Sequence, residues 1–420
     1  MNVILLCHYF APEPGAPSAR LFEISREWAK HGHAVKVVTC FPNHPTGVVP
    51  PRYRGRLQVV DDLGDIRVYR NWTYVTSNEG VLKKTIGHLS FMATSVLLSL
   101  FRTGPADVVV VSSPTFFSIF SGYVFSRIKR APLVLEIRDL WPAAIIELGV
   151  LRNRALIYVL EALELWAYRA ANHVVVVTEA FKENLVSRGI AAEKVTVITN
   201  GVDLERYSPG PKSEAVGEML DCRGKSLVLY IGALGMSQGL ESVIGAAERL
   251  KGRGDVVFAL VGEGAEKARL QRLAAELGLA GVRFLPAQPK ERMPDFYRTA
   301  DVCLVPLRNV ALFKGFIPSK MFEIMACGRP IVASLAGEAA HILDRSGGAV
   351  VVPPEDSAAI AGAILGLVED RVARNRLGAA GAAFVARHYD RAKLALEYER
   401  LLALAGRGAG EQSVDWGSRP

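Results

Sequence analysis

Short, almost continuously apolar segments alternate with segments of helical periodicity along the first half of the chain. β-Branched residues dominate the apolar segments, which is typical of parallel strands that are buried on both faces. Ser18 can cap the first helix, and Gly32 can end it. The strands expected in this half cover residues 3–7, 34–39, 66–70, 107–112, 132–137, 173–178 and 195–199.

The alternation stops in a stretch rich in Pro and Gly and then begins again. Residues 201–224 have weak periodicity, so we expect a linker there. Beyond it, strands are expected at residues 227–231, 256–261, 282–285, 302–305, 331–334 and 349–352. Helices are expected at residues 240–250, 265–277, 289–299, 319–327, 358–368, 372–388 and 391–404.

Strand–helix alternation on this scale predicts an α/β fold with two doubly wound domains. The length of 420 residues suits two domains of roughly 200 residues each. We expect an N-terminal domain over residues 1–200, the linker over 201–224 and a C-terminal domain over 225–385. A helix over 386–405 is expected to return to the N-terminal domain, and the Gly-rich tail over 406–420 is expected to be disordered.

Charge and cysteine content narrow the choice of partner and compartment. The formal net charge of +8 and the pI near 9.2 indicate an anionic partner. The basic residues are scattered and not interleaved with aromatic ones, which argues against nucleic acid. The five cysteines form no Cys-x-x-Cys pair, so a disulfide framework or zinc site is not expected, and a reducing, cytoplasmic compartment fits. Residues 1–7 lack a basic flank and are expected to be a strand, not a signal peptide.

Ligands of doubly wound sheets bind at the loops that follow the carboxyl ends of the strands. The first such loop, residues 11–18, contains Gly15 and leads into a helix whose free N–H groups suit an anion. The loop over residues 232–239 carries three glycines and suits a phosphate cradle. Gly262 and Gly264 form a tight turn after the next strand. Each of these loops also has a plainer interpretation as a connector or turn.

A fourth loop, which leads into the helix expected at residues 319–327, carries the strongest signal. Pro318 and Ser319 open that helix, so backbone N–H groups and Lys320 can meet a diphosphate. Glu323 lies one turn further along and can accept hydrogen bonds from ribose hydroxyls. The alternative is that Lys320 and Glu323 are an exposed surface pair at helical spacing.

This segment resembles the donor-site signature of the family-4 retaining glycosyltransferases. It reads Pro318-Ser319-Lys320-x-x-Glu323-x-x-Ala326-x-Gly328-x-Pro330. Further matches to that family are His31-Gly32-His33-x-Val35, Asn200-Gly201-Val202-Asp203, Gly262-x-Gly264 and Val282-x-Phe284-Leu285. The motif Arg138-Asp139-Leu140-Trp141-Pro142 is similar to the branch that builds bacterial O-antigen, capsule and exopolysaccharide, including the L-fucosamine transferases. The resemblance covers the chain to about residue 404.

The resemblance implies the GT-B fold, in which two Rossmann-like domains face a cleft. It implies an acceptor-binding N-terminal domain, a nucleotide-sugar-binding C-terminal domain and transfer of a hexosyl or N-acetylhexosaminyl group with retention. The implied donor is a UDP-sugar and the implied acceptor a saccharide linked to polyprenyl diphosphate. No Asp-x-Asp motif is found, so we expect neither a metal nor another cofactor.

The family pattern also assigns site residues. The implied catalytic residues are Arg138, Asp139, Lys320 and Glu323. The implied donor-binding residues are Gly232, Gly235, Gln238, Gly239, Gly262, Gly264, Leu285, Gly315, Pro318, Ser319, Lys320 and Glu323. Gly15 and Ala16 are expected on the acceptor side.

The sequence departs from the family pattern at the diphosphate. Members commonly carry a Glu where Gly315 stands, a basic pair where Ala233 and Gln238 stand, and a His where Arg138 stands. The positive field would then come from Lys320, Arg138, Lys314 and the glycine backbone. Two roles are open for Arg138: it reaches the leaving phosphate, or it pairs with Asp139 or Glu136.

Residues 81–101 form an apolar run flanked by Lys83, Lys84 and Arg102. Its uncharged part is shorter than the roughly 20 residues that a spanning helix needs. The run either lies on the inner face of the cytoplasmic membrane, where basic residues meet anionic lipid, or packs as a helix against the sheet.

Two rival functions also fit the fold. One is a sugar-nucleotide epimerase or hydrolase, which turns the donor over without an acceptor. The other is a non-catalytic subunit that binds the nucleotide sugar, for which Gly315 is the argument. A dehydrogenase is not expected, because the first loop lacks Gly-x-Gly-x-x-Gly.

Overall fold

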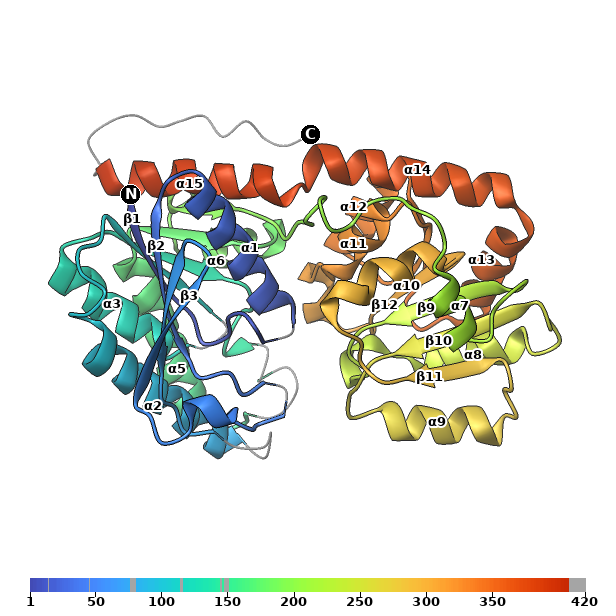
Figure 1. The fold of residues 1–420 in the computed structure, drawn as a ribbon, viewed down its shortest axis with the longest axis horizontal. Helices are drawn as coiled ribbons and strands as arrows, with labels where there is room; N and C mark the ends of the chain where they lie inside the picture. Colours follow the sequence, from blue (N-terminus) through green and yellow to red (C-terminus); the bar gives the residue numbers. More distant parts are fainter. Residues whose placement is uncertain are drawn as a thin grey trace. The chain divides into compact units, whose positions relative to one another are not determined.

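The computed structural model describes residues 1–407 except 14, 45, 76–80, 114–115, 144–145 and 147–150 (Figure 1). The tail expected to be disordered lies outside the described residues from 408 onward. Internal contacts divide the chain into two compact units. The first unit is Met1–Thr199 together with the chain from Ala392 onward, and the second is Asn200–Arg391.

The first unit is built on an eight-stranded sheet of order β3-β4-β2-β1-β5-β6-β7-β8. All neighbouring strands are parallel except β3 and β4, which are antiparallel. The strands are β1 (Asn2–Leu6), β2 (Ala34–Cys40), β3 (Gln58–Leu63), β4 (Ile66–Asn71), β5 (Val108–Ser112), β6 (Leu133–Ile137), β7 (His173–Val176) and β8 (Val195–Val197). The sequence missed β3, because this edge strand alternates half-buried and exposed positions and has no continuous apolar run.

Helices α1 (Ala16–Lys30) and α15 (Arg391–Arg407) pack together in the core of the first unit. The indole Nε1 of Trp28 donates to the carbonyl oxygen of Ala395 at 3.1 Å, and the Trp28 ring meets Tyr398 edge-on. The other helices of this unit are α2 (Val81–Ser99), α3 (Ser118–Lys129), α5 (Arg154–Ala170) and α6 (Glu179–Ser187). Helix α15 is therefore a core element of the unit that contains β1.

The expected N-cap of α1, Ser18, is wrong by three residues. The N-cap is Gly15, with a φ of 115°, and Ser18 lies buried inside the helix. Pro17 accounts for the difference, because its fixed φ favours the first turn of a helix.

The second unit has a six-stranded, fully parallel sheet of order β11-β10-β9-β12-β13-β14. The strands are β9 (Ser226–Ile231), β10 (Val256–Val261), β11 (Val282–Leu285), β12 (Val302–Pro306), β13 (Ile331–Ser334) and β14 (Ala349–Val352). All six strands expected in this half are present. Strands β9, β10, β12 and β13 are buried along almost their whole length, and β11 and β14 are partly buried but mostly apolar. Chain order reverses between β9 and β12, so the ligand crevice of this sheet is expected beyond their carboxyl ends.

Helices cover both faces of this sheet. One face packs against α7 (Glu214–Met219), α10 (Met293–Thr299), α11 (Lys320–Ala326), α12 (Glu338–Ser346) and α14 (Arg371–His388). The other packs against α8 (Glu241–Arg249), α9 (Lys267–Glu276) and α13 (Ser357–Glu369).

The stretch expected to be a linker, residues 201–224, differs from that expectation. It belongs to the second unit, and Val202, Tyr207, Val216 and Leu220 lie in its core. Its few apolar residues are separated by Pro, Gly and charged residues, which hides the burial from a search for periodicity.

Candidate functional site

The loops that follow β9, β10 and β11 are joined into one surface by backbone hydrogen bonds. The N–H of Gly232 donates to Val261 at 2.9 Å, and that of Gly262 donates to Leu285 at 3.0 Å. A Cβ on Gly262 would collide with the carbonyl oxygen of Gly232, and one on Gly264 would collide with the carbonyl oxygen of Leu234. Gly262 and Gly264 are therefore required for the loop after β10 to pack against the loop after β9.

Lys320, the first residue of α11, directs its ammonium into this surface. The Nζ atom lies 4.1 Å from the centroid of the Tyr230 ring, within cation–π distance. A Cβ on Gly232 would lie too close to this Nζ and 3.2 Å from Cε. The Tyr230 hydroxyl donates to the carbonyl oxygen of Ala233 at 2.6 Å, which fixes the ring under the glycine loop. The strongest sequence motif and the first glycine of the 232–239 loop thus meet at one cation.

The buried ammonium of Lys320 is suited to bind an anion. Burial lowers the pKa of Lys320 to about 8, and the negative charge of Glu323 opposes this shift only in part. Loss of hydration disfavours a charged ammonium, so an incoming anion would stabilise it. Lys320 is therefore a partly desolvated cation, and no carboxylate in the described part of the chain forms an ion pair with it.

Glu323 is held by a buried tyrosine from the neighbouring helix α10. The hydroxyl of Tyr297 donates to Oε2 of Glu323 at 3.0 Å, and Tyr297 itself is buried. Burial, followed by the charge of Glu323, raises the pKa of Tyr297 well above its usual value, so the hydroxyl keeps its proton. A buried donor of this kind fixes the orientation of the carboxylate.

A cavity of about 280 Å³ opens beside the glycine loop. Gly235 and Gly239 line it, together with Arg308, which follows β12, and Glu355, which follows β14. The Nε atom of Arg308 lies 3.5 Å from Glu355, and the N–H of Asn309 donates to the same carboxylate at 2.9 Å. The Oε1 atom of Gln238 is buried and has no hydrogen-bond partner in the described part of the chain.

Sequence reasoning missed Tyr297, Arg308 and Glu355. Arg308 could have been found, because it is a basic residue at the carboxyl end of an expected strand. Nothing in the sequence connects Tyr297 with Glu323, since the two lie on separate helices.

The remaining residues predicted for the donor lie in the turn before α11. Residues Ala311–Gly315 form a 3₁₀ helix, and the backbone of Lys314 lies so close to Gly337 that a Cβ there would collide with it. Pro318 and Ser319 precede α11, and the side chain of Ser319 makes no capping hydrogen bond. Gly315 leaves this turn without the carboxylate that the family pattern carries there.

Arg138 and Asp139 follow β6 in the first unit. The Nε atom of Arg138 donates to the carbonyl oxygen of Ser113 at 2.7 Å and lies 3.6 Å from Glu136. Burial would raise the pKa of Glu136, but Arg20 and Arg138 hold it below its usual value. Burial raises the pKa of Asp139, and Arg138 offsets part of that rise. Of the roles considered for Arg138, pairing with Glu136 is present, and contact with a leaving phosphate stays a prediction.

Gly15 and Ala16 mark the start of α1, at the end of the loop that follows β1. Gly15 has a φ of 115°, which suits glycine and few other residues.

Comparison with known proteins agrees with these features over both units. Residues 18–206 match the family described as Glycosyltransferase Family 4, and residues 222–384 match Glycosyl transferases group 1. The chain is a family-4, group 1 glycosyltransferase. It is 29% identical over 350 residues to a putative colanic acid biosynthesis glycosyl transferase, WcaI, of Escherichia coli, covering 80% of this chain and 85% of that one.

Two solved structures show the same fold. Sucrose-phosphate synthase from Thermosynechococcus elongatus superposes with a TM-score of 0.76 at 18% identity, covering 96% of this chain and 98% of that one. HepE from Anabaena, solved with UDP and glucose, superposes with a TM-score of 0.71 at 20% identity, covering 96% and 99%. The predicted GT-B architecture of two Rossmann-like units is confirmed.

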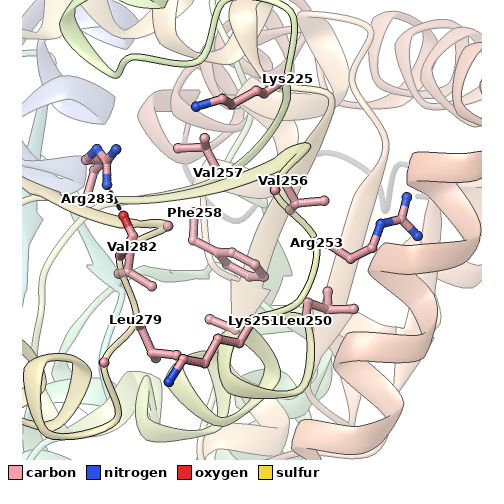
Figure 2. Close-up of a pocket in the computed structure, with 15 residues that line it drawn as sticks. Lys225, Leu250, Lys251, Arg253, Val256, Val257, Phe258, Leu279, Val282 and Arg283 are labelled. Atoms are coloured by element: carbon pink, nitrogen blue, oxygen red, sulfur yellow. Dashed lines mark hydrogen bonds between the residues drawn. The ribbon is translucent and has the colours of Figure 1, made fainter.

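The glycosyltransferase has a larger cavity, of about 320 Å³, at the opposite edge of the second sheet (Figure 2). It is lined at the amino ends of β9, β10 and β11, by Lys225 and Arg253 before the strands and by Phe258 and Arg283 within them. Arg253 is paired there with Asp255 and Glu369. Ligands of doubly wound sheets bind at the carboxyl ends of the strands, so this cavity is not the expected donor site although it is the larger of the two.

Among the residues that the structure describes, no group of three His, Cys, Asp or Glu side chains is arranged to hold a metal ion.

Proposed function

We propose that this glycosyltransferase moves a hexosyl or N-acetylhexosaminyl group from a UDP-sugar to a lipid-linked saccharide in bacterial surface polysaccharide synthesis. The observation that carries the donor assignment is the ammonium of Lys320 held between Tyr230 and Gly232 at the switch point of the second sheet. The similarity to a putative colanic acid enzyme over 80% of this chain supports the pathway class. The UDP in HepE supports uracil as the base.

In this proposal, Lys320 neutralises the diphosphate as it departs. Positioned cations and N–H groups that meet developing charge are a large source of catalysis. The carboxylate of Glu323, oriented by Tyr297, accepts hydrogen bonds from ribose hydroxyls and so fixes the nucleotide. The buried Oε1 of Gln238, which lacks a partner in the described chain, is a further acceptor for a donor hydroxyl.

The proposed transfer retains the anomeric configuration without a protein nucleophile. The bond between the anomeric carbon and the β-phosphate oxygen breaks, and a bond to the acceptor oxygen forms on the same face. The acceptor proton passes to the departing phosphate oxygen. Arg138, fixed at the end of β6 by Glu136 and Ser113, is the proposed cation of the first unit for that phosphate.

Helix α2 supports binding at a membrane surface. One face packs on β2 and β4, with Phe91 and Ser95 fully buried. The opposite face exposes Ile86 (44%), Leu89 (38%) and Leu97 (78%), and Phe101 (82%) follows in the next turn. Basic residues flank this stripe at both ends, which is typical of helices that lie on anionic lipid. No helix in the described ranges is both long and apolar enough to cross a bilayer.

The test is donor turnover by the full chain. Purified protein is mixed with UDP-, GDP- and ADP-sugars, with and without a membrane extract that supplies lipid-linked acceptor, and nucleotide release is measured. Release from a UDP-sugar that depends on acceptor is the expected result. Release without acceptor would favour an epimerase or hydrolase, and tight binding without release would favour a binding subunit.

A further inference from the structure

A third cavity, of about 200 Å³, lies in the first unit where β1, β2 and β4 end. The side chains that matter are His8 and Tyr9 after β1, His44 after β2, and Lys83, Lys84 and His88 in the first two turns of α2. None of the residues predicted for the donor or acceptor lines this cavity, so its chemistry is so far unassigned.

His8 is the buried polar group of the cavity. Only 7% of the residue is exposed, and its Nδ1 atom has no hydrogen-bond partner among the described residues. Its ring centroid lies 5.0 Å from that of His88 and 4.9 Å from that of Tyr9. A buried polar atom without a partner costs stability unless a ligand or water satisfies it. His8 therefore points to a polar occupant.

The charge of the cavity is positive at its rim and neutral inside. Burial is the main cause that lowers the pKa of His8 to about 3 and that of His88 to about 4, and the charge of Lys84 lowers the latter further. Both imidazoles are neutral near pH 7 and each offers one N–H donor. The ammonium groups of Lys83 and Lys84 are exposed on the first turn of α2, where the helix dipole also favours an anion.

The wall of the cavity is fixed by close contacts between α2 and the chain after β4. A Cβ on Gly87 would lie 2.8 Å from the carbonyl oxygen of Tyr74, so only glycine allows this approach. The Thr73 hydroxyl donates to the Gly87 carbonyl at 2.8 Å, and the N–H of Tyr74 donates to Ser90 at 2.8 Å. A preformed wall lowers the cost of ordering a ligand.

Glu13, in the loop after β1, is an acidic residue of this unit that does not line the cavity. Glu13 accepts hydrogen bonds from the N–H groups of Asn43 at 2.8 Å and His44 at 2.9 Å. Burial raises the pKa of Glu13, which favours its neutral form.

We infer that this cavity binds a phosphoryl group, a phosphate ester or diphosphate, carried by the acceptor. Lys83 and Lys84 supply the charge, and His8 and His88 donate from within. The inference rests on the proposed function, which makes the acceptor lipid-linked. The exposed apolar stripe of α2 begins one turn beyond Lys83, so a lipid chain would lie beside its own phosphate.

The full-length protein is first saturated with UDP, which occupies the donor site. It is then titrated calorimetrically with inorganic pyrophosphate and with farnesyl diphosphate, a short polyprenyl diphosphate. We expect Lys84→Ala and His88→Ala to weaken both probes about tenfold or more, as for lost hydrogen bonds to a charged group. Lys393→Ala, which removes an exposed ammonium of the same unit outside the cavity, is expected to change neither.

Two His8 variants separate chemistry from folding, since His8 is buried. His8→Asn keeps an N–H donor near Nδ1 and is expected to bind the probes, whereas His8→Leu is expected to weaken them. Failure of both probes to bind with UDP in place, or equal binding by all variants, would overturn the inference. A further outcome is that Lys84→Ala binds both probes normally and loses only binding to vesicles that contain phosphatidylglycerol. That result would assign the cavity to membrane lipid and would also overturn the inference.

The two proposals fail separately. If UDP does not bind at all while Lys84 is still required for pyrophosphate, the donor assignment is wrong and the phosphoryl site stands. If every variant binds UDP equally and Lys84→Ala does not weaken either probe, the phosphoryl site is wrong and the donor assignment stands.

Discussion

The ammonium of Lys320 lies 4.1 Å from the centroid of the Tyr230 ring. Gly232, the first residue of the 232–239 loop, packs against the same ammonium. Tyr230 belongs to β9, the strand at which the chain order of the second sheet reverses. The relationship therefore connects the one strong motif of the sequence with the strand end where the fold places a ligand. It also explains why a lysine, with its compact charge, suits this place.

Lys320→Met is expected to weaken nucleotide binding without destabilising the protein. Removing a partly desolvated charge relieves a burial cost, while the apolar side chain keeps its packing on Tyr230. The loss of one charge-assisted contact weakens UDP by about 1.5–3 kcal/mol, or roughly 10- to 150-fold. Melting temperatures with and without UDP measure both effects. Lys251→Ala, at the opposite edge of the same sheet, is the control (Figure 2).

A melting temperature that falls by many degrees in Lys320→Met, with UDP affinity intact, would mean that Lys320 serves the fold and not the donor.

Donor affinity is expected to fall with rising pH above about 8. The pKa of Lys320 is lowered to about 8 by burial, so below that pH the ammonium is already charged and UDP affinity is flat. Above it, binding must first take up a proton, and affinity falls about tenfold per pH unit until the higher pKa of the complex is reached. Calorimetry in buffers of different ionisation enthalpy should detect uptake of up to one proton. A Lys320→Arg variant that still binds should show no such slope.

An element of the fold can be predicted from the sequence when the residues that define it are close together in the chain. The six strands of the second sheet are mostly apolar, and β9, β10, β12 and β13 are buried along almost their whole length, so the apolar pattern finds them. Edge strand β3 is half exposed, and its only partner is β4 across a tight turn, so no apolar run reveals it. The buried stretch 201–224 was missed for a related reason, because its core residues are spaced irregularly.

The site shows the same limit. The motif around Lys320 and Glu323 lies within one turn of helix and can be recognised from the sequence alone. The partners that give these residues their properties, Tyr230 and Tyr297, come from other elements, and only the fold brings them together. The family resemblance assigns Gly262 and Gly264 to donor binding, and the structure adds a packing role between neighbouring loops that the sequence did not indicate.

Gly232→Ala and Gly262→Ala are expected to fail in different ways. At Gly232 the added Cβ meets the flexible end of Lys320, so the ammonium moves and UDP affinity falls about tenfold, with a folding cost of roughly 1–3 kcal/mol from the positive φ. At Gly262 the Cβ meets a backbone carbonyl, which cannot move cheaply, so the melting temperature falls much further. Gly252→Ala has open space and is the control. Equal loss of stability at both sites would contradict this division.

Tyr297→Phe is expected to weaken UDP less than Glu323→Ala does. Removal of the carboxylate loses the ribose contacts, which are worth roughly 1–3 kcal/mol. Removal of the tyrosine hydroxyl leaves the carboxylate in place but frees its rotation, which costs about 0.5–1.5 kcal/mol of binding. Calorimetry with UDP and with uridine tests both, because uridine keeps the ribose and lacks the diphosphate. If Glu323→Ala weakens UDP but not uridine, the contact is not with the ribose.

Substitution of the exposed stripe of α2 is expected to reduce membrane binding while leaving donor binding unchanged. Leu97 and Phe101 are 78% and 82% exposed, so Leu97→Ser with Phe101→Ser removes apolar area without opening the core. Burying such side chains in the interface contributes about 1.5–3 kcal/mol each, so the double variant should lose most binding to vesicles that contain phosphatidylglycerol. Val372→Ser, equally exposed on α14 of the second unit, is the control. Binding by wild type that disappears at high salt but survives the double variant would mean that the basic residues act alone.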